Sequence, residues 1–206
     1  MTKEFTLKGN VASAIRSDEE LALIDKDIAD TAFKVQIKAF AEFLKQKGFV
    51  KFKSNSFLRR NQLEVLEYID IQKERYGSKT FTVNYALTSL YVPHSFFSFD
   101  ISERLGNLIC GKDIWWDYSN ELAAEESFNN IIEAIDSFLL PWFAEKDNAD
   151  AIKEMLLSEK KKRENYGGRL SDSQTYWLNI IENNTWNNEL VAANIDTFKL
   201  PKKLIR

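Results

Sequence analysis

The hydrophobic positions before residue 48 recur with helical spacing. Phe33, Ile37, Phe40 and Leu44 lie three or four residues apart and therefore share one face of a helix. The following segment "KQKGF" supplies lysines and Gly48, which are typical of a helix C-terminus. The pattern predicts an amphipathic helix with one buried stripe that ends at this glycine.

A helix start is also predicted further upstream. Ser17 precedes Glu20 by three residues, which is the spacing of a capping box, in which each side chain accepts a hydrogen bond from a backbone N–H. The pattern leaves open whether this helix, from about Asp18, continues into the next one or is separate.

The hydrophobic period then changes from helical to alternating. Residues 49–53, 57–61 and 63–72 are short alternations, and residues 81–92 alternate almost strictly between apolar and polar. The segment "RYGSK" joins the last two, and its Gly77 can take the positive φ of a tight hairpin. These segments predict the strands of an antiparallel meander.

Two further helices are expected to follow the strands. Residues 101–109 resemble a short helix that ends near Gly111. Residues 121–143 carry a wide apolar face, so they predict a long amphipathic helix that covers the sheet and ends before Pro141.

The remainder of the chain favours helix. One helix is expected to run to about residue 162, and another around 171–183. The predicted fold class is α+β, with an antiparallel β-meander packed by amphipathic helices. We expect an α+β domain over residues 1–145 and a helical C-terminal extension, 146–206, packed on or near it.

Composition narrows the class of protein. The chain has 206 residues, 44% of them hydrophobic, which suffices for one sizeable core. The net charge of −3 gives no overall reason to expect nucleic acid or an anionic membrane. A single cysteine and no signal-like start favour a cytoplasmic protein without membrane association. The oligomeric state stays open.

Charge is unevenly distributed along the chain. Residues 45–60 carry six basic residues and no acidic one, whereas residues 117–154 carry ten acidic residues and two basic ones. A basic hairpin could bind an acidic protein or a nucleic acid. Alternatively, lysines such as Lys51 and Lys53 protect an edge strand against aggregation.

Several short motifs follow one another along the chain in an order typical of one protein family. They are a helix ending in "KGF", then "F-x-R-x-N", "IDIQKERYGS", "FTVN", "ERLG", "DIWW" and a helix ending in "LPWF". In this order the chain resembles the bacterial domain-of-unknown-function family 4304, over about residues 30–145. The resemblance implies an α+β fold and no known activity. The family pattern has a basic residue two positions before Arg104, where this chain has Ser102, which argues against a basic pair that holds an anion.

Catalytic and cofactor chemistry finds little support. His94 is the only histidine, and its segment "VPHSFF" does not resemble a nucleophile elbow. The sequence lacks phosphate-binding glycine loops and metal-ligand spacings, so we predict no catalytic residue, no metal site and no cofactor. One predicted strand carries four acidic residues, namely Glu64, Glu67, Asp70 and Glu74. Because successive residues of a strand face opposite sides, these carboxylates do not converge on one site.

Residues 101–119 could belong either to the hydrophobic core or to a functional site. Trp115 and Trp116 are adjacent, so in an extended chain one enters the core and the other faces solvent, a helix or a partner. We interpret the segment mainly as core, with at most Trp116 left for a partner. Arg104 is expected to pair with an acid of the sheet such as Glu67 or Asp70, or else to bind an anion. Cys110 is interpreted as a small buried hydrophobic residue.

The first functional hypothesis is therefore a non-catalytic protein-binding module, of an immunity or regulatory type, whose partner is another protein. The alternatives are a nucleic-acid-binding protein that uses the basic hairpin 45–60, and an enzyme with an unrecognised carboxylate site. The residues that we expect to bind a partner are Lys51, Lys53, Arg59, Arg60, Arg75, Tyr76, Arg104 and Trp116.

Overall fold

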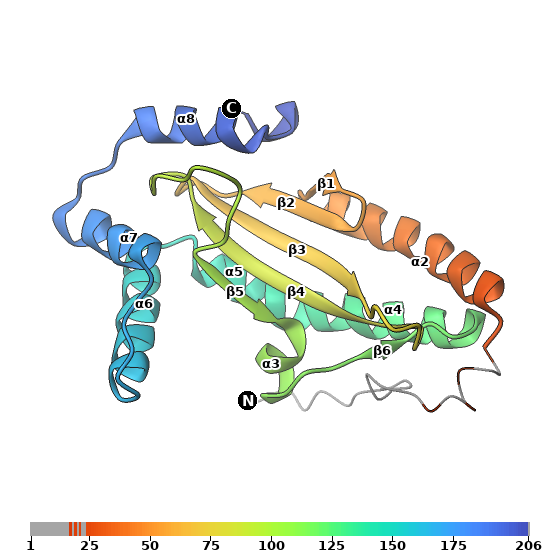
Figure 1. Cartoon of the computed structure of the whole chain (residues 1–206). Coiled ribbons are helices and arrows are strands. Elements are labelled where there is room, and N and C mark those ends of the chain that lie inside the picture. Colours follow the sequence, from red (N-terminus) through yellow and green to blue (C-terminus); the bar gives the residue numbers. More distant parts are fainter. Residues whose placement is uncertain (1–16, 18, 20, 22–23, 206) are drawn as a thin grey trace. The chain divides into compact units, whose positions relative to one another are not determined.

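The protein has an α+β fold (Figure 1), as predicted. The computed structural model describes residues 17, 19, 21 and 24–205, so Glu20 of the predicted capping box lies outside the described residues. The strands are β1 (Val50–Lys53), β2 (Ser56–Arg60), β3 (Val65–Lys73), β4 (Thr80–Ser89), β5 (Ile101–Arg104) and β6 (Trp116–Asp117). The α-helices are α2 (Lys26–Gln46), α3 (Leu105–Cys110), α4 (Glu121–Ala134), α5 (Leu140–Glu145), α6 (Ala149–Glu164), α7 (Asp172–Asn183) and α8 (Asn188–Phe198).

The sheet is the predicted antiparallel meander. Its strands follow the order β1-β2-β3-β4-β5, so neighbours in the sheet are also neighbours along the chain. The short strand β6 pairs antiparallel with β4 and places Trp116 opposite Phe81. The hairpin between β3 and β4 contains Gly77 at φ 92°, the positive φ that its place in the sequence predicted.

The chain forms two compact units that interleave along the sequence. Each unit takes parts of several strands, whereas the sequence suggested a single boundary after residue 145. Unit 1 comprises Met1–Phe57, Ile69–Tyr85 and Glu103–Pro141, and unit 2 comprises Leu58–Tyr68, Ala86–Ser102 and Trp142–Arg206.

An aromatic cluster forms the core of unit 1. The ring of Phe33 on α2 lies 5.5 Å from Phe81 on β4, 5.5 Å from Phe128 on α4 and 5.0 Å from Tyr118. Phe81 and Phe128 are themselves 5.1 Å apart. Figure 1 shows α2 and α4 on the same face of the sheet, and these rings fill the space between the three elements. The predicted stripe of α2 is buried at Phe33, Phe40 and Leu44.

The prediction of one helix over residues 101–109 is only half correct. Residues Ile101–Arg104 form β5, and helix α3 begins at Leu105 and ends at Cys110, followed by the capping Gly111 with φ 71°. The local pattern favours helix, but pairing beside β4 offers the first four residues backbone hydrogen bonds that a helix start leaves unmade. Tertiary pairing therefore overrides local propensity here.

The predicted helix end before Pro141 is wrong. Residues Ile135–Leu139 form a π-helical turn, in which the N–H of Leu140 donates to the carbonyl of Ile135, and α5 then continues through Pro141 to Glu145. Proline normally ends a helix because its ring clashes with the carbonyl of the preceding turn and because it lacks an N–H. The wider π-turn just before Pro141 accommodates the ring, so the chain stays helical.

Unit 2 contains the C-terminal helices. Helices α6 and α7 pack together, and α7 begins with a capping box formed by Ser171 and Gln174. The side chain of Gln174 also donates to the carbonyl of Asp100 at 2.9 Å. Asn194 on α8, a helix that the sequence did not single out, donates to the carbonyls of Leu90 and Val92. Two buried amides therefore fix α7 and α8 to the segment after β4.

Within the described part of the chain, no helix is both long and apolar enough to cross a membrane.

Gly106 allows α3 to pack closely on the following segment. A Cβ at this position would lie 2.6 Å from the backbone nitrogen of Ile114 and 2.9 Å from its Cγ1, and it would also clash with the carbonyl of Lys112. We expect Gly106→Ala to lower the free energy of unfolding by about 1–3 kcal/mol, because backbone atoms must move. Gly168→Ala is the matched control, because the nearest atom there is 3.4 Å away. Urea unfolding of both variants tests this, and equal stabilities would contradict it.

Candidate binding surface at the hairpin tip

The loop between β3 and β4, residues 74–79, is called the hairpin tip below. Its conformation is fixed by one carboxylate. Glu74 accepts hydrogen bonds from the backbone nitrogen of Tyr76 at 2.6 and 2.7 Å, and from the nitrogen and hydroxyl of Ser78 at 3.2 and 3.0 Å. The N–H of Glu74 donates to the carbonyl of Thr80 at 2.9 Å, which closes the loop. The tip is therefore held in one shape by its own sequence.

The electrostatics of Glu74 agree with this geometry. Partial burial by itself would raise the pKa of the Glu74 carboxyl, but the hydrogen bonds from the backbone of Tyr76 and Ser78 outweigh it and lower the pKa. The carboxylate is thus the form that the folded loop stabilises.

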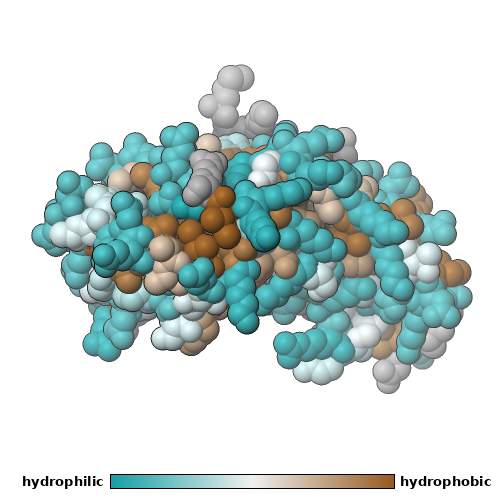
Figure 2. Space-filling model, turned by 90° about the horizontal axis from the view of Figure 1, so that it is seen from above, coloured by the Kyte–Doolittle hydropathy of each residue, from teal (hydrophilic) through white to brown (hydrophobic). Residues whose placement is uncertain are grey.

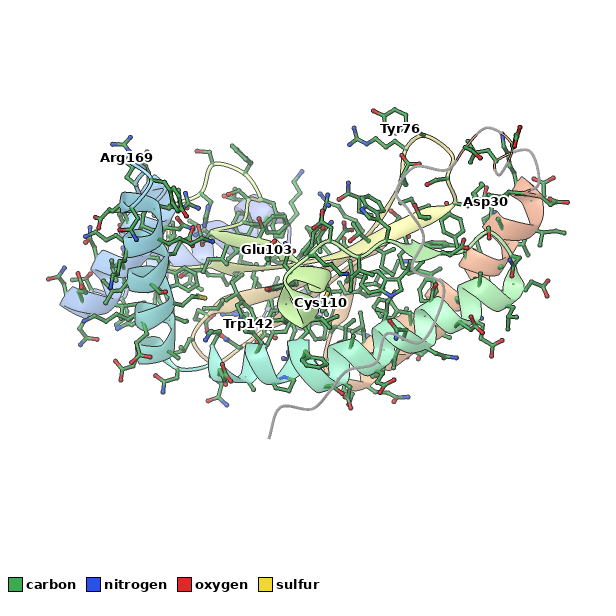
Figure 3. The ribbon with its side chains drawn as sticks, turned by 90° about the horizontal axis from the view of Figure 1, so that it is seen from below. Asp30, Tyr76, Glu103, Cys110, Trp142 and Arg169 are labelled. Atoms are coloured by element: carbon green, nitrogen blue, oxygen red, sulfur yellow. The ribbon has the colours of Figure 1, made fainter. Side chains whose placement is uncertain are left out.

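The base of the hairpin is tied to α2 by an ion-pair cluster. Asp30 on α2 accepts from Lys73 at 3.4 Å, at the end of β3, and from Lys79 at 3.0 Å, just before β4. Figure 3 shows Asp30 on α2 near the hairpin and Tyr76 at its far end. The pKa of Asp30 is lowered, because the two lysines outweigh the cost of burial. One carboxylate thus connects both strands of the hairpin to α2.

Two of the predicted binding residues project from this tip. Arg75 is exposed, and Tyr76 is 89% exposed, although it is a large aromatic residue. Because Glu74 holds the backbone on both sides, the tyrosine is presented on an ordered loop. Tyrosine and arginine are the residue types that most often dominate binding energy at protein interfaces.

Two further predicted residues lie on the edge strand β1 of the same unit. Lys51 and Lys53 are both exposed, and the ammonium group of Lys53 lies 5.1 Å from the ring centroid of Phe52. The N–H of Ile71 donates to the carbonyl of Asn55, so the turn after β1 lies beside the end of β3 that leads into the tip. The turn that follows Lys53 therefore lies beside β3, three residues before the hairpin tip begins.

Arg59 and Arg60, in contrast, are engaged inside unit 2. Arg59 donates to Glu67 at 2.5 Å. Arg60 is buried, forms an ion pair with Glu64 and donates to the carbonyl of Leu204 at 2.8 Å. These two predicted binding residues are therefore already engaged in ion pairs within unit 2.

Glu67 needs its arginine, because its side chain is only 2% exposed. Burial is the largest influence on this group and raises the pKa of the Glu67 carboxyl, and the hydrogen bond from Arg59 offsets this only in part. The pair is thus a structural element of unit 2.

The region of the paired tryptophans also differs from the expectation. Trp116 is only 2% exposed and donates from its indole nitrogen to Asn130 at 3.0 Å, so it belongs to the core and is not a surface anchor. Trp115 is the half-buried one, and the guanidinium of Arg104 lies 5.3 Å from its ring. Arg104 forms its ion pair with Asp113, and not with Glu67 or Asp70. Alternation was predicted correctly, but the register of β6 decides which tryptophan is buried.

Cys110 is exposed, which corrects its interpretation as a buried residue. Helix α3 has only six residues and buries Leu105 and Gly106 at its start, so its last residue faces solvent. The thiol donates to the carbonyl of Gly106 at 3.4 Å. His94 lies in unit 2, where its Nδ1 is 3.1 Å from the hydroxyl of Ser98.

The strand carboxylates have separate partners. Glu64 contacts Arg60, Glu67 contacts Arg59, Asp70 lies 3.5 Å from the amide of Asn84, and Glu74 fixes the hairpin tip. Among the residues that the structure describes, no three histidine, cysteine or acidic side chains are grouped closely enough to hold a metal ion.

The comparisons with known proteins identify a family for this chain. Residues 40–145 match the family model of DUF4304, described as a domain of unknown function. The chain belongs to the DUF4304 family. The match begins ten residues later than the sequence resemblance suggested, and it includes the C-terminal part of α2, all six strands and the helices α3, α4 and α5. No curated protein and no solved structure matches this DUF4304 chain significantly.

Sequence reasoning missed the two acids that organise the surface of this DUF4304 domain. By sequence pattern alone, Glu74 is one of several strand carboxylates. Its carboxylate bonds the backbone N–H groups of the residues two and four positions later, and an acidic residue at the start of a turn is a signal for such a side-chain cap. Asp30 gives no such signal, because it is 43 residues from Lys73 and only the fold brings them together.

We expect Glu74→Gln to loosen the hairpin tip without unfolding the domain. The amide side chain loses the charge that strengthens bonds to the backbone N–H groups. Hydrogen exchange at Tyr76 and Ser78 should therefore be faster in this variant, whereas Glu126→Gln, at an exposed position of α4, should leave it unchanged. Because the pKa of Glu74 is lowered, its contribution is present at neutral pH and lost as the pH falls below its ordinary value of 4.5. Unchanged exchange in Glu74→Gln would contradict this role.

Arg59→Met should leave Glu67 buried without its partner and lower the free energy of unfolding by about 2–3 kcal/mol at pH 7. The folded pKa of Glu67 is raised, so the folded state binds this proton more tightly than the unfolded state. Stability from this group therefore falls as the pH rises above the ordinary value of 4.5, and the loss in Arg59→Met should shrink as the pH is lowered towards 5.

Lys51→Met removes an exposed cation and serves as the control for Arg59→Met. Its stability should stay within about 0.5 kcal/mol of wild type at every pH. Urea unfolding between pH 5 and 7 provides the measurement. If Arg59→Met loses the same free energy of unfolding at every pH, or loses none, then Arg59 does not stabilise the ionised, buried Glu67 as predicted.

Proposed function

We propose that this DUF4304 domain is a non-catalytic protein-binding module that binds an acidic segment of another protein. The binding surface consists of Arg75 and Tyr76 at the hairpin tip together with Lys51 and Lys53 on β1. The single observation that carries the proposal is the 89% exposure of Tyr76 on a loop held by the bonds to Glu74. A preformed loop loses little conformational entropy when it binds, so more of its contact energy contributes to affinity.

The charge of the surface favours an acidic partner. Lys51, Lys53 and Arg75 are all exposed. Cations around an aromatic anchor attract acidic side chains over a distance and orient the partner before contact. The aromatic ring then supplies apolar contact area. An immunity or regulatory protein that masks such a partner is one form of this proposal.

The ion pairs reduce the support for the nucleic-acid alternative. Arg59, Arg60 and Arg104 each pair with a carboxylate, so three of the predicted cations are already partly neutralised within the fold. Binding to phosphates gains affinity with each cation that can replace counterions. Figure 2 shows a face on which hydrophilic residues predominate and some hydrophobic residues are also exposed. A protein partner that combines acidic and apolar contacts suits the exposed Arg75 and Tyr76 better than a phosphate backbone.

Site-specific photocrosslinking tests the proposal. A photoreactive phenylalanine derivative replaces Tyr76 in one protein and Tyr166 in a control, because Tyr166 is 86% exposed and lies in unit 2. Irradiation in lysate of the source cells should give a protein adduct at position 76 and none at position 166. The crosslinked partner peptide should be rich in aspartate and glutamate. The adduct should decrease at least tenfold, about 1.4 kcal/mol, in a Lys51→Glu, Lys53→Glu background.

Three outcomes would refute the proposal. Equal labelling at both positions would show nonspecific contact. A nuclease-sensitive adduct whose yield falls steeply with salt would support nucleic-acid binding instead. An adduct that persists in the Lys51→Glu, Lys53→Glu background would show that these two lysines are not part of the binding surface.

A further inference from the structure

The amine of Lys73 lies in an unusual environment at the base of the hairpin. Its nitrogen is 3.8 Å from the ring centroid of Phe33 and 4.7 Å from that of Tyr118. Both rings belong to the buried aromatic core of unit 1, and the side chain of Lys73 is only 32% exposed. A lysine normally keeps its ammonium group in water, whereas this one lies against the edge of the core.

Its electrostatic support is shared with a second lysine. Asp30 accepts from Lys73 at 3.4 Å and from Lys79 at 3.0 Å, so the shorter contact belongs to Lys79. Burial lowers the pKa of the Lys73 ammonium, Asp30 opposes this, and repulsion from Lys79 and Lys34 adds to the lowering. Desolvation and a neighbouring cation are the two means by which proteins turn lysine into a nucleophile.

We infer that Lys73 is a covalent modification site, whose amine is acylated by small acyl phosphates ahead of the fully exposed lysines of the chain. The class of reagent follows from the local charge. Lys34 and Lys79 both act on Lys73 as neighbouring cations, and Lys73 and Lys79 both pair with Asp30. Such a cluster attracts an anionic electrophile and stabilises the phosphate that leaves. This inference does not depend on the proposed protein-binding function.

The reaction is an ordinary acyl transfer. The neutral amine of Lys73 attacks the carbonyl carbon of the acyl phosphate, and a C–N bond forms. The C–O bond to phosphate breaks, and the phosphate leaves with its electron pair. The proton lost from nitrogen passes to the departing phosphate, so no oxidant or further reactant is needed.

Acylation would change the base of the hairpin. An amide carries no positive charge, so it cannot form the ion pair with Asp30 or the cation contacts with Phe33 and Tyr118. Asp30 would then hold only Lys79 of these two lysines. The connection between α2 and the β3 side of the hairpin would be weakened.

The test uses acetyl phosphate as the probe on the full-length chain. The protein is incubated at pH 8, and the fraction acetylated at each lysine is followed by mass spectrometry during the first few percent of reaction. We expect the initial rate at Lys73 to exceed the rates at the exposed Lys34 and Lys51 by about threefold or more, since a lowered pKa leaves a larger fraction of this amine neutral at pH 8. The rate at Lys73 should also level off at a lower pH than the rate at Lys51.

A matched pair of variants separates chemistry from mere exposure. Asp30→Asn removes the carboxylate that stabilises the ammonium form of Lys73 and should accelerate its acetylation. Asp27→Asn removes the same charge from an exposed position of α2, and Asp27 is not among the groups that act on Lys73 in the described part of the chain. The acetylation rate at Lys73 in this variant should therefore equal the wild-type rate within experimental error.

Two results would overturn the inference. In wild type, a rate at Lys73 no higher than at Lys34 and Lys51 would show that burial protects the amine more than it activates it. A rate profile at Lys73 with the same pH dependence as that at Lys51 would show that the amine is not activated. Both measurements use the wild-type protein and do not require that any variant folds.

Discussion

The contact of Phe33 with Phe81 and Phe128 is the interaction on which the rest of unit 1 depends. It joins α2, β4 and α4 through rings that are all buried, and it fixes the position of α2 along the sheet. Asp30 lies about one turn before Phe33 on the same helix, so the core contact also brings Asp30 to the base of the hairpin. The shape of the hairpin end thus follows from packing in the core, because a helix transmits the position of one residue to the next turn.

The polar side chains divide into those that the fold uses and those that it leaves at the surface. Arg59 and Arg60 satisfy buried or partly buried carboxylates in unit 2, and Arg104 pairs with Asp113 beside Trp115. Burying a carboxylate without a partner is costly, so a cation near one is recruited into the structure. Arg75 and Tyr76 are not used in this way, because they lie on the exposed tip of the hairpin; Figure 3 shows Tyr76 at its outer end. The proposed binding surface lies where the fold has no internal use for the side chains.

Much of the fold of this DUF4304 chain could be predicted from local pattern, and less of the candidate surface. Helix α2, the strands β1 to β4 and Gly77 in the hairpin all followed from periodicity and turn chemistry. Arg75 and Tyr76 are on the surface, as the turn position implied. The errors at Ile101–Arg104 and Pro141 have one cause, since strand pairing and a π-turn supply hydrogen bonds that local propensity does not include.

The sequence by itself determined where the chain is helical or extended over most of its length, and that one hairpin tip is exposed, because spacing of apolar residues and the freedom of glycine act locally. The tertiary structure alone decided which carboxylate each arginine meets, which of Trp115 and Trp116 is buried, and that Lys73 lies on the rings of Phe33 and Tyr118. These outcomes depend on register and on contacts between residues far apart in the chain. A shift of one residue in β6 would exchange the two tryptophans, and nothing in the local pattern sets that register.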